Sequence, residues 1–124
     1  MSKSTILVVE DEESLVRSYS KFLSREGYEV LTANNGQQAI DVIANATPDL
    51  ILLDLTMPVL DGVGFLEKSE VAKKLPNTKI IVFTNSEDDE RIDKAFEFGA
   101  SRYLIKAMLA PKELAQILKD ELDS

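Results

Sequence analysis

The chain has 124 residues, and 44% of them are hydrophobic, which allows one domain with a buried core and excludes a disordered segment. It contains no cysteine, so disulfide bonds and thiolate chemistry are excluded. The formal net charge of −8 argues against nucleic acid and anionic lipid as partners, because binding to either depends on clustered Lys and Arg.

The apolar segments are too short to span a membrane or to form the core of a signal peptide. Near the N-terminus, for example, only residues 6–9 are strongly apolar before Glu10 interrupts them. We therefore expect a soluble cytoplasmic protein with no membrane partner, and a single domain that covers residues 1–124.

Short apolar runs alternate with segments of helical periodicity along the whole chain. The apolar runs predict strands at 6–9, 28–32, 49–53, 79–83 and 102–105. Apolar residues at helical spacing predict helices at 15–23, 39–44, 65–75, 87–98 and 111–122. Gly27 and Gly99 fit helix ends, and Pro111 fits the first turn of the last helix. This alternation with short loops predicts an α/β fold, in which a five-stranded parallel sheet has helices on both faces.

Polar residues follow the strands of the predicted sheet. They are Glu10 and Asp11 after the first strand, Asp54 after the third, Thr84 after the fourth and Lys106 after the fifth. Because the carboxyl ends of parallel strands share one edge, we expect these side chains to converge. Carboxylates packed together repel unless a cation offsets them, and Mg²⁺ is held by carboxylates together with phosphoryl oxygens. The cluster therefore predicts a site for Mg²⁺ and a phosphoryl group, with a carboxylate available as nucleophile.

Four segments, in this order, closely resemble response-regulator receiver domains. They are VVEDE (8–12), LLDLTMPVLDG (52–62), VFT (82–84) and GASRYLIK (99–106). The resemblance covers nearly the whole chain and implies the flavodoxin-like receiver fold with strand order 2-1-3-4-5. In that order the first and third strands are neighbours, which would place Glu10 and Asp11 beside Asp54.

The resemblance also implies roles for the acidic residues. Asp54 would accept a phosphoryl group from a histidine kinase or a phosphotransfer protein in a Mg²⁺-dependent reaction of a two-component phosphorelay. Asp11 would bind Mg²⁺ directly and Glu10 through water, while Asp54 and the backbone carbonyl of Thr56 would be further ligands. The domain would be a signalling receiver, and not an enzyme beyond its own phosphorylation and dephosphorylation.

The same resemblance implies a switch. Lys106 would contact the phosphoryl oxygens, Thr84 would bond the phosphoryl group and move toward it, and Tyr103 would rotate inward as Thr84 moves. A downstream protein would then bind the surface formed by the helix at 87–98, the strand around Tyr103 and the helix at 111–122.

The chain departs from the receiver pattern at three positions. Ala107 replaces the usual proline after Lys106, and since a cis bond before a non-proline residue costs ~3–4 kcal/mol, we predict a trans Lys106–Ala107 bond and a somewhat displaced loop. If the displaced loop limits the rate of phosphorylation, Ala107→Pro should increase that rate. Asn85 stands where a small residue is usual and would crowd the phosphoryl pocket. Ala110 lacks a capping side chain, although Glu113 can still favour the start of the last helix.

Three other functions are compatible with parts of this pattern. A phosphatase of the haloacid-dehalogenase type would also use an aspartate nucleophile, but such enzymes carry a second Asp where this chain has Thr56, and the chain is short for a substrate-binding cap. A flavodoxin would bind phosphate after the first strand, where residues 10–13 are all acidic and would repel it. A receiver fold that binds a partner without being phosphorylated is favoured by the departures at Asn85 and Ala107.

Overall fold

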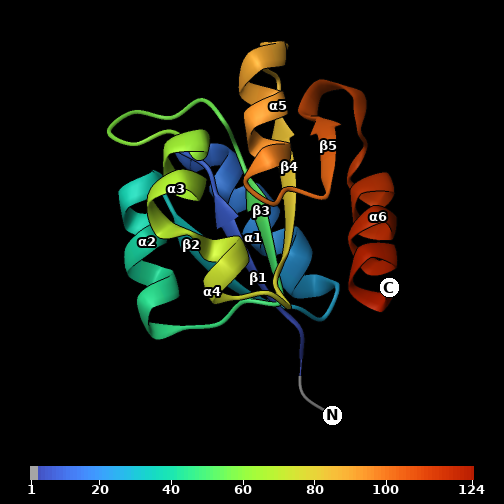
Figure 1. The fold of residues 1–124 in the computed structure, drawn as a ribbon. Coiled ribbons are helices and arrows are strands. Elements are labelled where there is room, and N and C mark those ends of the chain that lie inside the picture. Colours follow the sequence, from blue (N-terminus) through green and yellow to red (C-terminus); the bar gives the residue numbers. More distant parts are fainter. Residues whose placement is uncertain (1–2) are drawn as a thin grey trace.

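A computed structural model describes residues 3–124 of the chain. Its centre is a parallel sheet with the strand order β2-β1-β3-β4-β5 (Figure 1), which confirms the fold that the resemblance implied. The strands are β1 (Thr5–Val9), β2 (Glu29–Ala33), β3 (Leu50–Leu53), β4 (Lys79–Thr84) and β5 (Arg102–Ile105). Within residues 3–124, no helix combines the length and the apolar character that crossing a membrane requires.

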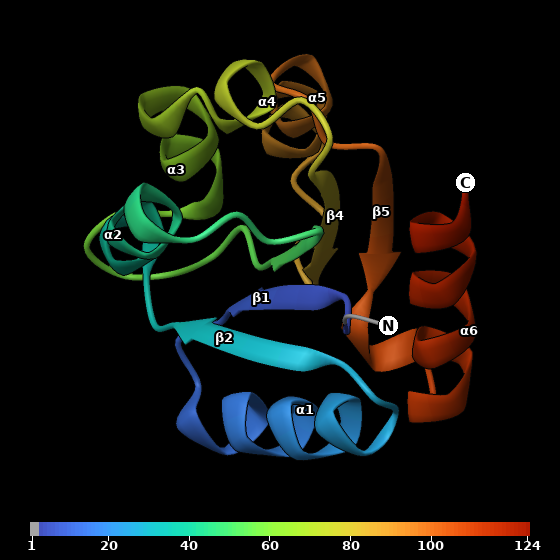
Figure 2. The same cartoon turned by 90° about the horizontal axis from the view of Figure 1, so that it is seen from below.

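Helices enclose the sheet on both faces. α1 and α6 cover one face, and α2, α3, α4 and α5 cover the other (Figure 2). The bounds are α1 (Glu13–Arg25), α2 (Gly36–Asn45), α3 (Gly62–Ser69), α4 (Val71–Lys74), α5 (Asp89–Glu97) and α6 (Pro111–Asp123). A short 3₁₀ turn, η1 (Lys106–Met108), leads out of β5.

The strands divide the hydrophobic core between the two faces, because successive side chains of a strand point to opposite sides. In β1, Leu7 and Val9 belong to the cluster beneath α2, α3 and α5. Ile6 and Val8 belong to the cluster beneath α1 and α6. All four residues of β3 are buried, as expected for a central parallel strand that reads as a continuous apolar run.

Acidic residues cap the helices that border the carboxyl edge of the sheet. The Asp61 side chain accepts the N–H of Gly64 at 2.8 Å and begins α3. Asp88 caps α5, so this helix starts at Asp89 and not at the predicted residue 87. At α6 the Glu113 carboxylate accepts the N–H of Ala110 at 3.0 Å, which confirms that Glu113 supports this helix start.

The single helix predicted for residues 65–75 is wrong. Glu70 adopts the left-handed conformation, with φ 52° and ψ 36°, and separates α3 from α4. The Ser69 hydroxyl accepts the N–H of Val71 at 3.2 Å, and Val71 is fully buried. The left-handed residue costs roughly 1–2 kcal/mol, which the burial of a Val side chain, worth about 1.5–3 kcal/mol, can offset. Tertiary packing therefore overrides the helical periodicity at this point.

Candidate functional site

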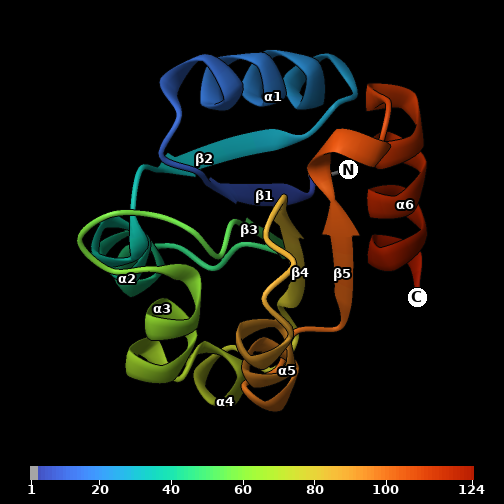
Figure 3. The same ribbon diagram turned by 90° about the horizontal axis from the view of Figure 1, so that it is seen from above.

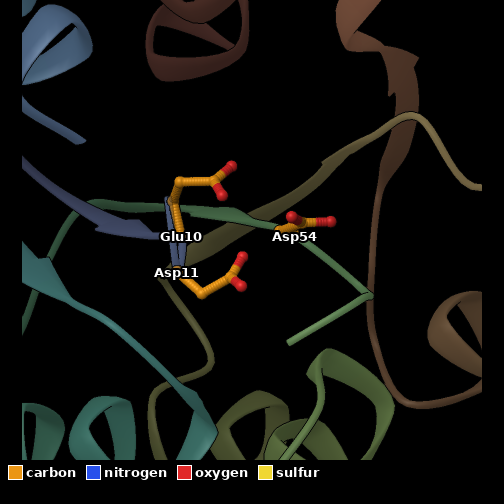
Figure 4. Close-up of side chains that lie close together, drawn as sticks. All are labelled: Glu10, Asp11 and Asp54. Atoms are coloured by element: carbon orange, nitrogen blue, oxygen red, sulfur yellow. The ribbon is translucent and has the colours of Figure 1, made fainter. Parts of the chain in front are cut away.

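β1 and β3 lie side by side and end at the same edge of the sheet (Figure 3). Three carboxylates meet at this edge. Val9 pairs with Leu53 in the parallel register, so the next residues, Glu10 and Asp54, leave neighbouring strands at the same level. Each of Glu10, Asp11 and Asp54 offers a carboxylate oxygen, and these oxygens lie within 4.8 Å of one another. Figure 4 shows Glu10 and Asp11 reaching from the end of β1 toward Asp54. The predicted convergence of the acidic residues is therefore present.

The acidic residues differ in their surroundings. Glu10 and Asp54 are buried, with 3% and 7% of their surfaces exposed, whereas Asp11 is exposed. Both oxygens of Glu10 are engaged, because one pairs with Lys106 and the other accepts the N–H of Glu12 at 3.0 Å. Burial raises the pKa of Glu10 above its ordinary value, although the hydrogen bond with Lys106 opposes this shift. Asp11 is thus the carboxylate that is most accessible to a cation.

Lys106 is the cation of the cluster. Its Nζ lies 2.9 Å from Oδ2 of Asp54 and also forms an ion pair with Glu10. The lysine side chain is only 9% exposed. Burial lowers the pKa of Lys106, but the hydrogen bonds to Glu10 and Asp54 and the negative charges of these two groups together outweigh this effect, so its pKa lies above the ordinary value. The ammonium partly balances the charge of the carboxylates that it contacts.

Asp54 also receives two neutral hydrogen bonds, both at Oδ1. The hydroxyl of Thr84, a buried residue at the end of β4, donates to Oδ1 at 2.7 Å. The backbone N–H of Thr56 donates to the same oxygen at 3.2 Å. With Lys106 on Oδ2, these donors hold the carboxylate in one orientation at the base of a pocket.

A chain of hydrogen bonds connects Asp54 to β5. The N–H of Ser86 donates to the Thr84 hydroxyl oxygen at 3.2 Å, and the hydroxyl of Tyr103 donates to the Ser86 carbonyl at 2.7 Å. Tyr103 is half-buried and lies on β5 opposite Val82 of β4. Thr84 and Tyr103 are thus linked through Ser86, a residue that the sequence did not single out.

An open pocket of about 480 Å³ gives access to this cluster from outside. Its walls include six of the predicted site residues: Glu10, Asp11, Asp54, Thr56, Thr84 and Lys106. Carboxylate and carbonyl oxygens are the ligands that Mg²⁺ prefers. The donor set therefore fits Mg²⁺, and Lys106 and Thr84 provide donors for an anion beside it.

A profile of the response regulator receiver domain matches residues 6–119. The chain belongs to the response-regulator receiver domain family. Receiver domains are signalling domains, so membership favours the signalling hypothesis over the phosphatase and flavodoxin alternatives.

Similar proteins share the receiver sequence or its fold. The alkaline phosphatase synthesis transcriptional regulatory protein PhoP of Bacillus subtilis is 39% identical over 113 residues, which cover 88% of this chain and 44% of that protein. The sporulation initiation phosphotransferase F of the same organism is 31% identical, over 86% of this chain and 84% of that protein. The chain spans about half the length of the transcriptional regulators it matches.

Solved structures agree with membership in the receiver domain family. A CheY-like response regulator receiver domain protein from Methanospirillum hungatei superposes with a TM-score of 0.91 at 31% identity, covering 98% of this chain and 95% of that chain. A chemotaxis protein of Vibrio cholerae superposes with a TM-score of 0.86 at 28% identity, covering 96% of this chain and 98% of that chain.

In this receiver domain, Asn85 and Ala107, the two departures from the receiver pattern near the pocket, are hydrogen-bonded to each other. The N–H of Ala107 donates to Oδ1 of Asn85 at 2.9 Å. A proline at position 107 would have no N–H to donate. The structure has no cis peptide bond within residues 3–124, so the predicted trans Lys106–Ala107 bond is confirmed. Lys106 nevertheless reaches both Glu10 and Asp54, and the expected displacement does not remove it from the site.

Arg91 was missed by the sequence reasoning. Its guanidinium forms an ion pair with Asp61 at 2.9 Å and donates to the backbone carbonyl of Leu55, next to Asp54 in the chain. In the sequence, Arg91 is one cation among the acidic residues that begin a helix, a position where a solvent-exposed side chain is expected. Nothing in the local pattern pairs it with a loop 30 residues earlier.

Proposed function

We propose that this receiver domain is a phosphoacceptor of a two-component phosphorelay and that it acts in the cytoplasm. Asp54 would take a phosphoryl group from a histidine kinase or a phosphotransfer protein, with Mg²⁺ bound, and the change would alter a partner-binding surface. One observation carries the proposal: the buried carboxylate of Asp54 lies between the Lys106 ammonium and the Thr84 hydroxyl, with the oxygens of Glu10 and Asp11 beside it.

The chemistry follows from these contacts. A carboxylate oxygen of Asp54 attacks phosphorus, the P–N bond of a phosphohistidine breaks, and an acyl phosphate forms on Asp54. Asp11 and Asp54, the Thr56 carbonyl and Glu10 through water would hold Mg²⁺, which offsets the repulsion between carboxylates and phosphoryl oxygens. Lys106, which already contacts Asp54, would pair with a phosphoryl oxygen.

The hydrogen bonds of Thr84 provide a route to a partner surface. Thr84 would exchange its bond to Asp54 for one to the phosphoryl group, and Ser86 and Tyr103 are next in the chain of hydrogen bonds. Tyr103 belongs to β5, between α5 and α6. We propose that the face formed by α5, β5 and α6 binds a downstream protein. The acidic charge of the chain supports a protein partner over nucleic acid.

Intact-mass measurement tests the proposed function directly. The protein is incubated with acetyl phosphate and Mg²⁺, and we expect a product that is heavier by one phosphoryl group. The same incubation with excess chelator is the control and should give little product. If the mass does not change with Mg²⁺ present, the domain is not a phosphoacceptor, and binding of a partner without phosphorylation becomes the better hypothesis.

Mg²⁺ binding is expected to depend on Asp11 more than on Glu10. Asp11 is exposed, whereas both oxygens of Glu10 are already bonded to protein groups. Asp11→Asn should therefore weaken Mg²⁺ binding by roughly tenfold or more, and Glu10→Gln should weaken it less. Isothermal titration calorimetry compares the two variants, and equal losses would contradict the ranking.

Phosphorylation should shift the backbone amide signals of α5, β5 and α6. The hydrogen-bond chain from Asp54 ends at Tyr103 on β5. Two large apolar side chains of this part of the chain are exposed: Phe96 of α5 at 43% and Met108 of η1, between β5 and α6 in the sequence, at 73%. Heteronuclear NMR with and without the phosphodonor measures the shifts, with Asp54→Asn treated in the same way as control. Shifts confined to α1 and α2 would contradict the proposed surface.

Ala107→Pro is not expected to accelerate phosphorylation. Lys106 already contacts Asp54 at 2.9 Å, so the lysine needs no repositioning. The substitution instead removes the hydrogen bond from the Ala107 N–H to Asn85, which contributes about 1 kcal/mol. We expect an unchanged or lower rate of phosphorylation. We also expect a small decrease in the free energy of unfolding, measured by urea denaturation. A clear rate increase would show that the loop is displaced after all.

A further inference from the structure

The Arg91 side chain connects α5 to the loop that follows Asp54. Besides its ion pair with Oδ2 of Asp61 and its hydrogen bond to the Leu55 carbonyl, Nη1 lies 3.5 Å from the hydroxyl oxygen of Thr56. The side chain is 28% exposed, so most of it is buried between the two segments. All three acceptors belong to the segment just after the proposed phosphoacceptor.

The contact with the Leu55 carbonyl matters because that oxygen belongs to the Leu55–Thr56 peptide unit. The N–H of the same unit is the Thr56 N–H, which donates to Oδ1 of Asp54 at 3.2 Å. A peptide unit is planar and rigid, so fixing its carbonyl fixes the direction of its N–H. A cation at the carbonyl also polarises the unit and strengthens the N–H as a donor. Arg91 and Asp54 therefore bind opposite ends of one rigid group.

Other contacts make this arrangement stiff. The N–H of Gly62 also donates to the Leu55 carbonyl, at 3.2 Å. Asp61 uses its second oxygen, Oδ1, to cap α3, so the carboxylate that faces Arg91 is itself held. The N–H of Arg91 is bonded to the N-cap Asp88 at 3.4 Å, which anchors the arginine to the start of α5. The guanidinium thus joins two helix starts to the peptide next to Asp54.

We propose that Arg91 is a positioning residue for Asp54: it holds the Leu55–Thr56 peptide so that the Thr56 N–H stays directed at Oδ1 and keeps the carboxylate oriented. Its importance for phosphorylation rests on the function proposed above. Thr56 lines the pocket and Arg91 does not, so the arginine acts through the peptide and not on the phosphoryl group. Lysine is a poor replacement, because a single ammonium cannot present the planar fork of donors that reaches these acceptors.

Phosphorylation rates of three variants test this inference. Arg91→Met should slow phosphoryl incorporation from acetyl phosphate by roughly tenfold, the low end of the effect of removing a group that orients site residues. Arg91→Lys should fall between Arg91→Met and wild type. Arg17→Met is the matched control, because Arg17 is exposed on α1, outside the pocket and the proposed partner face, and it should react like wild type. Equal rates for wild type and Arg91→Met would overturn the inference.

Amide hydrogen exchange at Thr56, measured by NMR without phosphodonor or Mg²⁺, gives a second readout that is independent of phosphorylation. Exchange should be faster in Arg91→Met than in wild type and unchanged in Arg17→Met. If Arg91→Met does not fold, Asp61→Asn removes the same ion pair and keeps an oxygen for the Gly64 N–H, and it should show the same direction of change. Unchanged Thr56 exchange in the folded variants would overturn the inference. If wild type gains no phosphoryl group but Thr56 exchange changes as expected, the proposed function fails and the positioning by Arg91 is supported.

Discussion

Asp54→Asn is expected to abolish phosphoryl incorporation from acetyl phosphate. The substitution keeps the shape of the side chain, and the amide oxygen can still accept the hydrogen bonds of Thr84 and the Thr56 N–H at Oδ1. It removes the anionic oxygen that attacks phosphorus and the ion pair with Lys106, so the nucleophile is lost while the hydrogen bonds at Oδ1 persist. Wild type and variant are each incubated with acetyl phosphate and Mg²⁺, and mass spectrometry measures the phosphoryl incorporation.

Asp41→Asn is the matched control for this experiment. Asp41 is exposed on α2, so the same chemical change there should leave incorporation at the wild-type level. Peptide mapping of the phosphorylated wild type should locate the modification at Asp54. Incorporation into Asp54→Asn at the wild-type rate would mean that another residue is the phosphoacceptor.

Lys106→Met is expected to lower the free energy of unfolding by about 3 kcal/mol when no metal is present. The lysine side chain is 9% exposed and forms ion pairs with Glu10 and Asp54, whose side chains are 4% and 8% exposed. Without the ammonium, two buried carboxylates remain with no counter-charge between them, and their repulsion and desolvation destabilise the folded state. Urea denaturation in the presence of a chelator measures the loss.

Addition of Mg²⁺ gives a second arm to the same experiment. A cation bound by the carboxylates would replace part of the missing charge, so Mg²⁺ should stabilise Lys106→Met more than it stabilises wild type. Lys112→Met is the control, because Lys112 is exposed on α6, and it should change stability by only a few tenths of a kcal/mol. Equal losses for Lys106→Met and Lys112→Met would show that the ion pairs contribute nothing measurable to stability.

The sequence by itself determined the class of fold and most of the pocket. Apolar runs such as 6–9 and 50–53 become β1 and β3 because a central parallel strand is buried on both faces and needs apolar residues throughout. Parallel pairing then brings the strand ends together, which is why Glu10, Asp54 and Lys106 could be assigned to one edge before their distances were known. The strand order came from the family resemblance, since periodicity alone does not fix which strands are neighbours.

Only the tertiary structure decided the contacts that support the pocket. Glu70 breaks a segment of continuous helical periodicity because Val71 must enter the core. In the sequence, Asn85 and Ala107 are two separate departures from the family pattern. Only the fold brings them together, so that the N–H of Ala107 donates to the amide oxygen of Asn85. Arg91 lies in the first turn of α5, yet its acceptors lie 30 to 36 residues earlier in the chain. Periodicity and capping are local properties of a few neighbouring residues, whereas these contacts depend on how separate helices and loops are oriented around the sheet.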